Sequence, residues 1–173
     1  MTRGGIAAVG LVGVAAVALP LTLRPAPALV WNTTASAPIG LYVARPEPRP
    51  AVGDWVIVRP PSPLAAELAA AGFLPMGVPL LKRIAAIAPS VACRAGAVVS
   101  INGRASAIAL SRDRFGRPLR EWSGCRRLKA GEVLLLNPDP RSLDSRYFGP
   151  LPARLILGRV TPLWVWGGAA DAR

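Results

Sequence analysis

One stretch of this sequence decides how the rest is interpreted: Asn137-Pro138-Asp139-Pro140-Arg141-Ser142-Leu143-Asp144-Ser145-Arg146-Tyr147-Phe148-Gly149-Pro150. It contains the pattern S-x-D-S-R, followed by two aromatic residues and a glycine. Taken alone, the stretch fits an ordinary loop in which Asp144 and Arg146 form a surface ion pair, an interaction that contributes little to stability. A more specific interpretation depends on which chemically capable residues the remainder of the chain supplies.

The absence of histidine limits that chemistry. Without an imidazole among the 173 residues, a Ser-His-Asp triad, a Cys-His dyad and a histidine-built metal site are excluded, and we predict neither a metal nor a cofactor. The stretch S-A-P-I-G-L-Y at 36–42 begins with Ser36, which could be a nucleophile or a turn residue before a proline. A serine nucleophile would need lysine as its base here, because a buried ammonium can lose its proton whereas arginine stays charged.

The chain offers two lysines as that base, Lys82 and Lys129. Alternation along a strand places Lys82 on the same face as Leu80 and Ile84, so we expect its side chain to point inward. Lys129 lies in the polar turn 126–132, where its amine should stay hydrated and protonated. Lys82 is therefore the candidate base, and lowering its pKa from about 10.4 to near 7 would oppose the charged form by roughly 4 to 5 kcal/mol.

Four short motifs occur in the order found in one peptidase family. They are Ser36 followed by Pro38, the G-D-W-V element at 53–56, the Lys82-Arg83 pair, and the S-x-D-S-R pattern at 142–146. Together they resemble the signal peptidase I family of Ser/Lys endopeptidases. The P-x-G-L-Y continuation after the serine, in place of the S-M-x-P-T of general leader peptidases, resembles the TraF-type conjugative transfer peptidases.

The resemblance implies a site made of catalytic Ser36, Lys82 and Asp144, supporting Ser142, Ser145 and Arg146, and an oxyanion donor, Thr34. Ser36 would attack the substrate carbonyl while neutral Lys82 takes its proton, which gives an acyl-enzyme. The Ser36 backbone N–H and the Thr34 hydroxyl would stabilise the oxyanion. Ser142 would orient the lysine amine, with Ser145 as a second contact. Asp144 would pair with Arg146 and brace the site.

The implied function is that of a membrane-associated serine endopeptidase, which processes a pilin or another exported component of a conjugative transfer apparatus. Its partners would be that peptide substrate, the cytoplasmic membrane and other conjugation components. Members of this branch can resolve the acyl-enzyme with the substrate's own N-terminal amine, which cyclises the pilin. Two alternatives are a general leader peptidase and a non-catalytic scaffold of the conjugation channel.

The N-terminus indicates export. Residues 4–23 carry no charge, and about 20 such residues can cross a bilayer as a helix. Arg3 precedes this stretch, and positive residues stay cytoplasmic, so we expect 1–28 to be a signal-anchor with a short linker and 29–173 to be a periplasmic peptidase domain. A cleavable signal peptide with small residues around 26–28 is the alternative.

The remaining sequence predicts a mainly β domain, an antiparallel sandwich or barrel like that of signal peptidases. Strands are expected at 53–59, 80–88, 97–101, 132–137 and 155–160, between Pro- and Gly-rich turns. One helix is expected over 64–71, with Ser62 as its N-cap, Pro63 at the first helical position and Gly72 ending it.

The two cysteines, Cys93 and Cys125, flank a predicted hairpin whose turn is Asn102-Gly103. In an exported protein they would form a disulfide, which would stabilise the fold by roughly 3 to 4 kcal/mol. Two buried free thiols are the alternative.

The net charge of +12 suggests an anionic partner. The basic residues are spread along the chain without a nucleic-acid recognition motif, so we expect attraction to anionic lipid headgroups and no nucleic-acid partner. Trp164 and Trp166 share one face of the segment 161–166, where they could lie at the membrane interface or pack in the core.

Overall fold

The computed structural model of the protein describes residues 4–5, 9–14, 29–47 and 49–166. The strands of its larger sheet are β1 (Leu29–Asn32), β2 (Ile39–Arg45), β3 (Trp55–Val58), β4 (Leu80–Ile87), β9 (Glu132–Leu135), β10 (Leu151–Pro152) and β11 (Ile156–Trp166). Those of the smaller sheet are β5 (Val91–Ala95), β6 (Val98–Ile101), β7 (Arg104–Ile108) and β8 (Gly124–Arg127). The helices are α2 (Ser62–Ala70), α3 (Ser145–Phe148) and a 3-10 turn at Ala153–Leu155.

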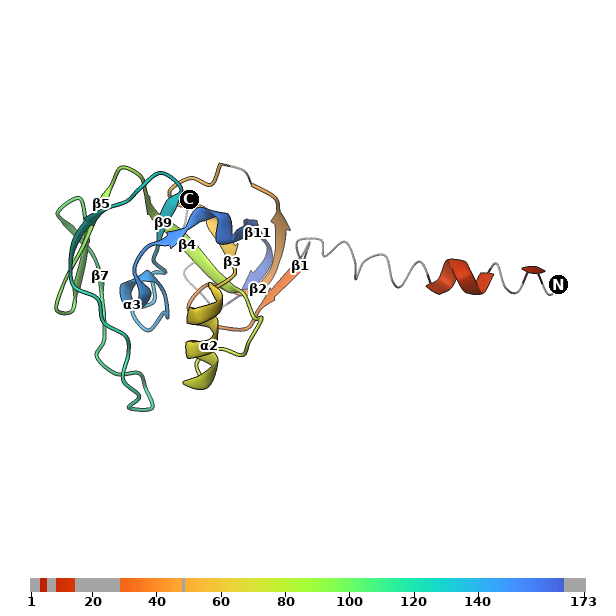
Figure 1. Cartoon of the computed structure of the whole chain (residues 1–173), viewed down its shortest axis with the longest axis horizontal. Helices are drawn as coiled ribbons and strands as arrows, with labels where there is room; N and C mark the ends of the chain where they lie inside the picture. The colour runs from red at the N-terminus through yellow and green to blue at the C-terminus, as the bar shows by residue number, and fades with distance from the viewer. Residues whose placement is uncertain (1–3, 6–8, 15–28, 48, 167–173) are drawn as a thin grey trace.

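Both sheets are antiparallel, with strand orders β1-β2-β11-β3-β4-β9-β10 and β7-β6-β5-β8 (Figure 1). The predicted mainly β, antiparallel fold is confirmed. Within the described residues the larger sheet is not a closed barrel, because its end strands β1 and β10 do not pair with each other. The chain passes from one sheet to the other where β4 is followed by β5.

The centre of the larger sheet is buried on both faces. Val56 and Val58 of β3 pack with Ile84 of β4 and with the apolar side of α2 on one face. Ile57 points to the other face, where it packs with Tyr42 and other buried residues. Because both of its faces are covered, β3 is a continuous apolar run.

The sequence predicted the end of helix α2 better than its start. Its N-cap is Pro61 and not Ser62, which is the first residue of the helix, and no side chain caps it. The predicted Ser62 cap was wrong by one position because Pro61 already has the extended backbone of an N-cap. Gly72 ends the helix as predicted: it has φ +69°, and the N–H groups of Gly72 and Phe73 donate to the carbonyls of Ala69 and Leu68.

All five predicted strands are present, and β11 extends further than expected, to Trp166. Sequence reasoning missed β2, β5, β8 and the two-residue β10. Gly40 explains why β2 is hard to recognise, since glycines are depleted in strands. Here Gly40 has φ +147°, and a Cβ on it would lie 2.7 Å from the Cα of Val165 in β11, so only glycine lets the two strands approach.

The C-terminal tryptophans are not part of the core. Trp164 and Trp166 are 65% and 45% exposed, so of the two alternatives that the sequence left open, packing in the core is wrong. They form one aromatic group with Trp31 of β1, whose ring centroid lies 5.3 Å from that of Trp166. β1 and β11 both flank β2, which brings these side chains to the same edge of the sheet.

The expected signal-anchor at 1–28 lies largely outside the described residues. Residues 4–5 and 9–14 are helical, and no helix in the described part of the chain is long and apolar enough to cross a membrane. The division into 1–28 and 29–173 stays a prediction.

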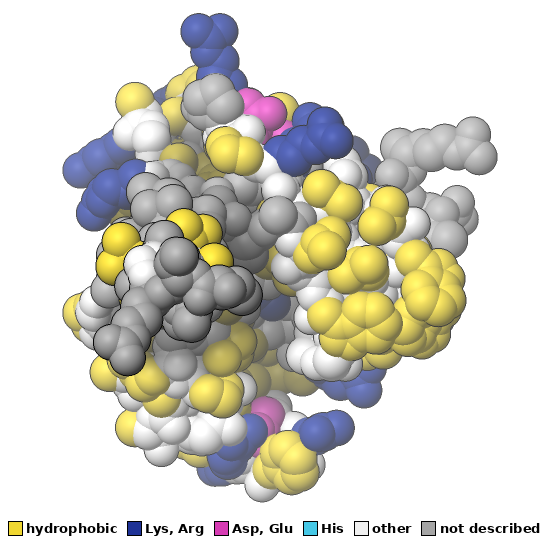
Figure 2. All heavy atoms as spheres, turned by 90° about the vertical axis from the view of Figure 1, so that its right-hand side faces the viewer, with side chains coloured by type: hydrophobic (Ala, Val, Ile, Leu, Met, Phe, Trp, Pro, Cys, Tyr) yellow, Lys and Arg dark blue, Asp and Glu magenta, His cyan; other side chains and the backbone are white. Residues whose placement is uncertain are grey.

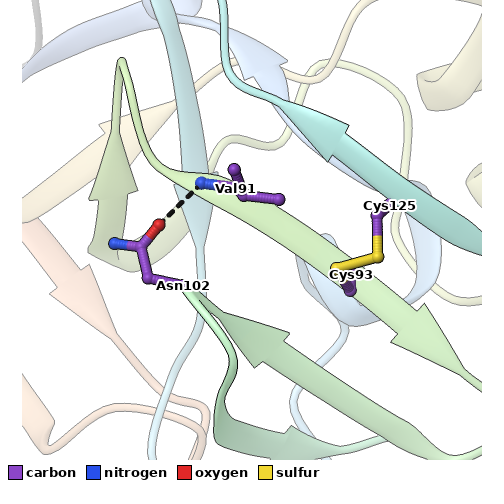
Figure 3. Close-up of a disulfide and its surroundings, with 4 residues drawn as sticks. All are labelled: Val91, Cys93, Asn102 and Cys125. Atoms are coloured by element: carbon purple, nitrogen blue, oxygen red, sulfur yellow. Dashed lines mark hydrogen bonds between the residues drawn. A yellow bond between two sulfur atoms is a disulfide. The ribbon is translucent and has the colours of Figure 1, made fainter.

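Cys93 and Cys125 form a disulfide that joins the paired strands β5 and β8 (Figure 3). Strand β8 is at the edge of the smaller sheet and all four of its residues are exposed, so hydrophobic burial holds it weakly. On the other side of β5, the Asn102 side chain accepts a hydrogen bond from the Val91 N–H at 2.8 Å and fixes the predicted hairpin turn.

We predict that this disulfide is formed in the protein recovered from cells. Without reductant, an alkylating reagent should label neither thiol, and Cys93→Ser or Cys125→Ser should lower the free energy of unfolding by roughly 3 kcal/mol, measured in urea. Reduced wild-type protein is the control, because it should lose the same amount. Free alkylation of both thiols in unreduced protein would contradict the prediction.

Candidate functional site

The amine of Lys82 is buried in the middle of the larger sheet, where β4 lies between β3 and β9. The residue is 3% exposed, and its Nζ donates a hydrogen bond to the Ser142 Oγ at 2.9 Å. Burial lowers the pKa of Lys82 to about 8, although the carboxylates of Asp144 and Asp139 oppose that shift. Lys129 is exposed. The inward orientation predicted for Lys82 is therefore confirmed.

Ser36 lies in a loop that the side chain of Asn32 organises. The Asn32 Nδ2 donates to the carbonyls of Thr34, Ala37 and Pro38 at 2.9, 3.2 and 2.9 Å, and its Oδ1 accepts from the Thr34 N–H at 3.2 Å. Together these bonds hold the backbone on both sides of Ser36. Asn32 was not among the predicted site residues, although an asparagine directly before a short polar loop is a recognisable signal of such a turn.

Asn137 connects the serine loop to the lysine strand. Its Nδ2 donates to the Ser36 carbonyl at 2.8 Å and to the Leu81 carbonyl at 3.2 Å, while its Oδ1 accepts from the Arg83 N–H at 2.9 Å. Leu81 and Arg83 are the two neighbours of Lys82 in β4. One amide therefore sets the position of the candidate nucleophile relative to the candidate base, and sequence reasoning missed this role.

Ser36 and Lys82 line the same cavity, which has a volume of about 760 Å³. Within the described residues no hydrogen bond joins the two side chains, and the nearest polar contact of the Ser36 Oγ is the Thr34 Oγ1 at 3.5 Å. Catalytic hydrogen bonds are often long or poorly aligned in enzymes without bound substrate and tighten when the substrate binds, so the lack of this bond is compatible with a joint role of the two side chains.

Thr34, the predicted oxyanion donor, gives its only hydroxyl proton to the Asn32 Oδ1 at 2.9 Å. To act on an oxyanion, that hydroxyl would have to rotate away from Asn32. The role of Thr34 stays a prediction.

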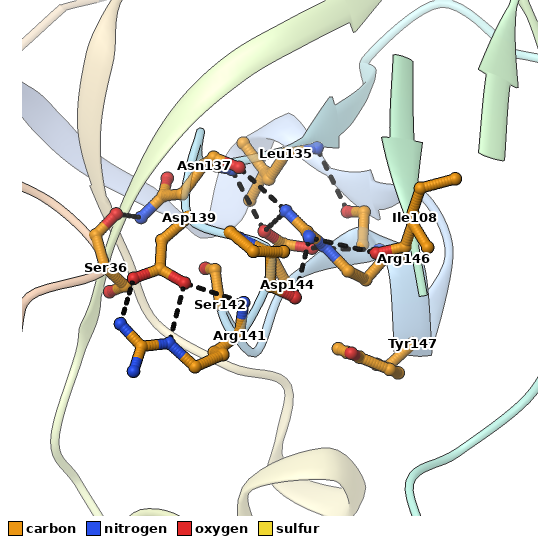
Figure 4. A network of polar contacts seen from close by, with 12 residues as sticks. Ser36, Ile108, Leu135, Asn137, Asp139, Arg141, Ser142, Asp144, Arg146 and Tyr147 are labelled. Carbon is orange, nitrogen blue, oxygen red and sulfur yellow. Dashed lines mark hydrogen bonds and ion pairs between the residues drawn. The ribbon is translucent and has the colours of Figure 1, made fainter. Parts of the chain in front are cut away.

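Asp144 and Arg146 form a fully buried ion pair (Figure 4). The Asp144 carboxylate accepts from the Arg146 Nε at 2.8 Å, from Nη2 at 3.0 Å and from the Asn137 N–H at 3.0 Å. The remaining Arg146 donors bind the carbonyls of Asn137, Pro140 and Ile108. Because Asp144 bonds to neither the Ser36 nor the Lys82 side chain, its geometry is that of a positioning residue.

Ser145 lies beside this pair and does not hydrogen-bond the lysine. Its Oγ accepts from the N–H of Leu135 in β9 at 3.0 Å, so it attaches α3 to the sheet. Of the two serines predicted to contact Lys82, the structure brings only Ser142 to the amine.

A family model described as signal peptidase, peptidase S26, matches residues 1–166. A probable conjugal transfer protein TraF from Sinorhizobium fredii is 41% identical over 138 residues, which are 73% of this chain and 72% of that protein. A plasmid transfer protein TraF from Escherichia coli is 33% identical over 92% of this chain and 95% of that protein. A signal peptidase I structure from Enterococcus faecalis covers 65% of this chain and 97% of its own, with 20% identity and a TM-score of 0.38.

We predict that Asn137→Ala slows acylation of Ser36 by an activated ester at least tenfold, because the serine loop loses its bond to β4. Mass spectrometry of the acylated protein measures the rate. The pH midpoint of the reaction should not move, since the surroundings of the Lys82 amine are kept. Asn102→Ala, which removes an amide from the β6–β7 turn, should leave the rate unchanged. A wild-type rate in Asn137→Ala would contradict the positioning role.

Lys82→Met should be more stable than wild type at neutral pH, by up to about 3 kcal/mol at pH 7. The native state holds fewer protons than the unfolded state between the lowered pKa of about 8 and the ordinary value of 10.5, so wild-type stability rises with pH in that window. The difference between the two proteins should therefore shrink by pH 10, as measured by urea unfolding. Lys129→Met is the control and should change stability little at either pH. A less stable Lys82→Met protein at pH 7 would contradict this.

Proposed function

The chain belongs to the peptidase S26 family of signal peptidases, among the relatives of the TraF conjugal transfer proteins, and from this we propose that it is a serine endopeptidase with Ser36 as nucleophile and Lys82 as general base. The buried amine of Lys82 supports the proposal most directly. It lines the cavity of Ser36, its pKa is lowered to about 8, and its bond to Ser142 directs the nitrogen. At pH 7 about a tenth of such amines are neutral.

The proposed reaction uses that neutral amine twice. The Ser36 Oγ attacks the scissile carbonyl while the Lys82 Nζ takes the hydroxyl proton, and the resulting ammonium then protonates the leaving amine. An ester remains on Ser36. A second nucleophile, either water or the free amine of the substrate, gives its proton to the Lys82 Nζ as it attacks the ester, and the resulting ammonium returns that proton to the Ser36 Oγ as the product leaves. The Ser36 N–H and the Thr34 hydroxyl are the proposed oxyanion donors.

We further propose that the substrate is a pilin or another exported component of a conjugative transfer apparatus. The names of the relatives support this context, since proteins matched over most of their length are described as conjugal or plasmid transfer proteins. Mass spectrometry of the product distinguishes hydrolysis from cyclisation, because a cyclic product is lighter than the linear one by one water molecule. A general leader peptidase is the alternative, and cleavage of many unrelated signal peptides would favour it.

A non-catalytic scaffold is the alternative outside the enzymes. Burial of Lys82 opposes its charged form by about 3 kcal/mol at neutral pH, and a scaffold would gain nothing from that cost. The presence of a buried lysine in the same cavity as Ser36 therefore favours a catalytic role over that of a scaffold.

We place the domain on the periplasmic side of the cytoplasmic membrane. Exposed apolar side chains gather on β1 and on the C-terminal half of β11, which flank β2, namely Leu29, Trp31, Leu163, Trp164 and Trp166. Figure 2 shows a group of hydrophobic side chains on the right of that view. Tryptophans favour the membrane interface, and the group begins at Leu29, six residues after the uncharged stretch 4–23. The disulfide also fits an oxidising compartment.

The dyad predicts the response of activity to substitution and to pH. Ser36→Ala and Lys82→Arg should abolish processing of the cognate precursor while circular dichroism stays native, since guanidinium cannot act as a base near neutral pH. Lys129→Arg should stay active. The wild-type rate should rise with pH as Lys82 deprotonates and level off above about pH 8. An active Lys82→Arg enzyme, or a rate that is flat between about pH 5 and 9, would disprove the dyad.

A further inference from the structure

Residues 109–120, which we call the arm, leave β7 and extend past α3 toward the end of α2 (Figure 1). The arm contributes Leu110, Arg114, Phe115 and Leu119 to the lining of the cavity that Ser36 and Lys82 also line. None of the motifs described above includes these residues. The arm is therefore a wall of the proposed site that the catalytic chemistry does not use.

The tip of the arm has a defined shape. The Asp113 carboxylate accepts from the backbone N–H groups of Phe115 and Arg117, each at 2.9 Å, and from the Arg117 Nε at 2.7 Å. Arg112 and Pro118 are paired across the turn as an isolated bridge. These contacts fix the backbone that carries Arg114 and Phe115.

The tip is also fastened to α2. The Arg117 Nη1 donates to the carbonyls of Ala71 and Gly72 at 2.9 and 3.0 Å, and its guanidinium lies 4.1 Å from the centroid of the Phe73 ring. These carbonyls are at the C-terminal end of the helix, where a positive group is favoured. A second contact joins the Arg120 Nη1 to the Glu67 carboxylate at 2.9 Å.

The base of the arm is held by the segment that positions the lysine. The Arg146 Nη1 donates to the Ile108 carbonyl at 3.2 Å, and the Tyr147 hydroxyl accepts from the Leu110 N–H at 3.1 Å. With both its base and its tip attached, the arm is preorganised, and a ligand that binds it need not order it first.

The chemistry at the tip suits an acidic and apolar ligand. Phe115 is 66% exposed, and the Arg114 guanidinium lies 4.6 Å from its ring centroid. Arg114 forms no ion pair with any described residue, whereas Arg117 is paired with Asp113. The arm holds four arginines and one aspartate, so its charge favours a carboxylate-bearing partner.

We propose that the arm is a substrate-binding subsite, in which Phe115 contacts an apolar side chain and Arg114 pairs with a neighbouring carboxylate of the polypeptide. This inference rests on the proposed peptidase function, because the occupant of the cavity is then an extended polypeptide. The subsite selects substrates by residues other than the two that flank the cleaved peptide bond.

The test measures peptide binding in the full-length Ser36→Ala protein, which cannot turn substrate over. Two fluorescent alanine-rich peptides are compared by anisotropy, one carrying Phe-Glu-Glu and the other Phe-Lys-Lys. We expect the acidic peptide to bind at least about fivefold more tightly. Adding Arg114→Glu should remove that preference, and Phe115→Ala should weaken the binding of both peptides. High salt should reduce the preference, since the tip is exposed.

Arg104→Glu is the matched control, because Arg104 is exposed on β7, does not line the cavity and undergoes the same change of charge. It should keep the preference for the acidic peptide. Equal affinity for the two peptides, or loss of the preference in Arg104→Glu, would overturn the subsite. Acylation of Ser36 by an activated ester in the otherwise wild-type protein is measured separately. Its absence would refute the peptidase function, and it does not depend on the arm.

Discussion

The buried ion pair of Asp144 and Arg146 is the constraint on which the site depends. A buried pair loses hydration, and it is tolerated only when its remaining hydrogen-bonding groups are satisfied. Here the five N–H donors of the Arg146 guanidinium all have acceptors, which are Asp144 and the carbonyls of Asn137, Pro140 and Ile108. Such a pair adds little stability compared with apolar packing, but it permits few alternative arrangements of the segments that it joins.

The buried amine of Lys82 differs from this ion pair, because burial disfavours its charged form. Its burial in the central strands disfavours the ammonium, and the hydrogen-bond partner of its amine among the described residues, Ser142, is neutral. The carboxylate of Asp144 partly offsets this effect, and the Arg146 guanidinium in turn weakens that offset. The pKa of about 8 is the result, low enough for a useful neutral fraction and high enough for the amine to hold a proton between two steps. The buried lysine thus lowers the stability of the fold at neutral pH, and it provides the proposed general base.

Sequence reasoning succeeded where local pattern determines the outcome. Alternation in β4 predicted that Lys82 points inward, and Gly72 predicted the end of α2. It could not find the roles of Asn32 and Asn137, because an amide can bind any backbone that approaches it. Ser36 and Asn137 are 101 residues apart in the chain, so no local pattern connects them. The exposure of Trp164 likewise depends on which residues the rest of the fold covers, and an apolar residue alone does not predict it.

Several separate elements of the fold contact the S-x-D-S-R segment, and this explains why its polar residues lie so close together in the sequence. Ser142 contacts the lysine of β4, Ser145 contacts β9, and Arg146 contacts the base of the arm. Asp144 completes the set by accepting from the N–H of Asn137, whose side chain binds the carbonyl of Ser36. Because one short segment contacts all of these elements, a substitution that displaces α3 would disturb the base, the nucleophile loop and the arm at the same time.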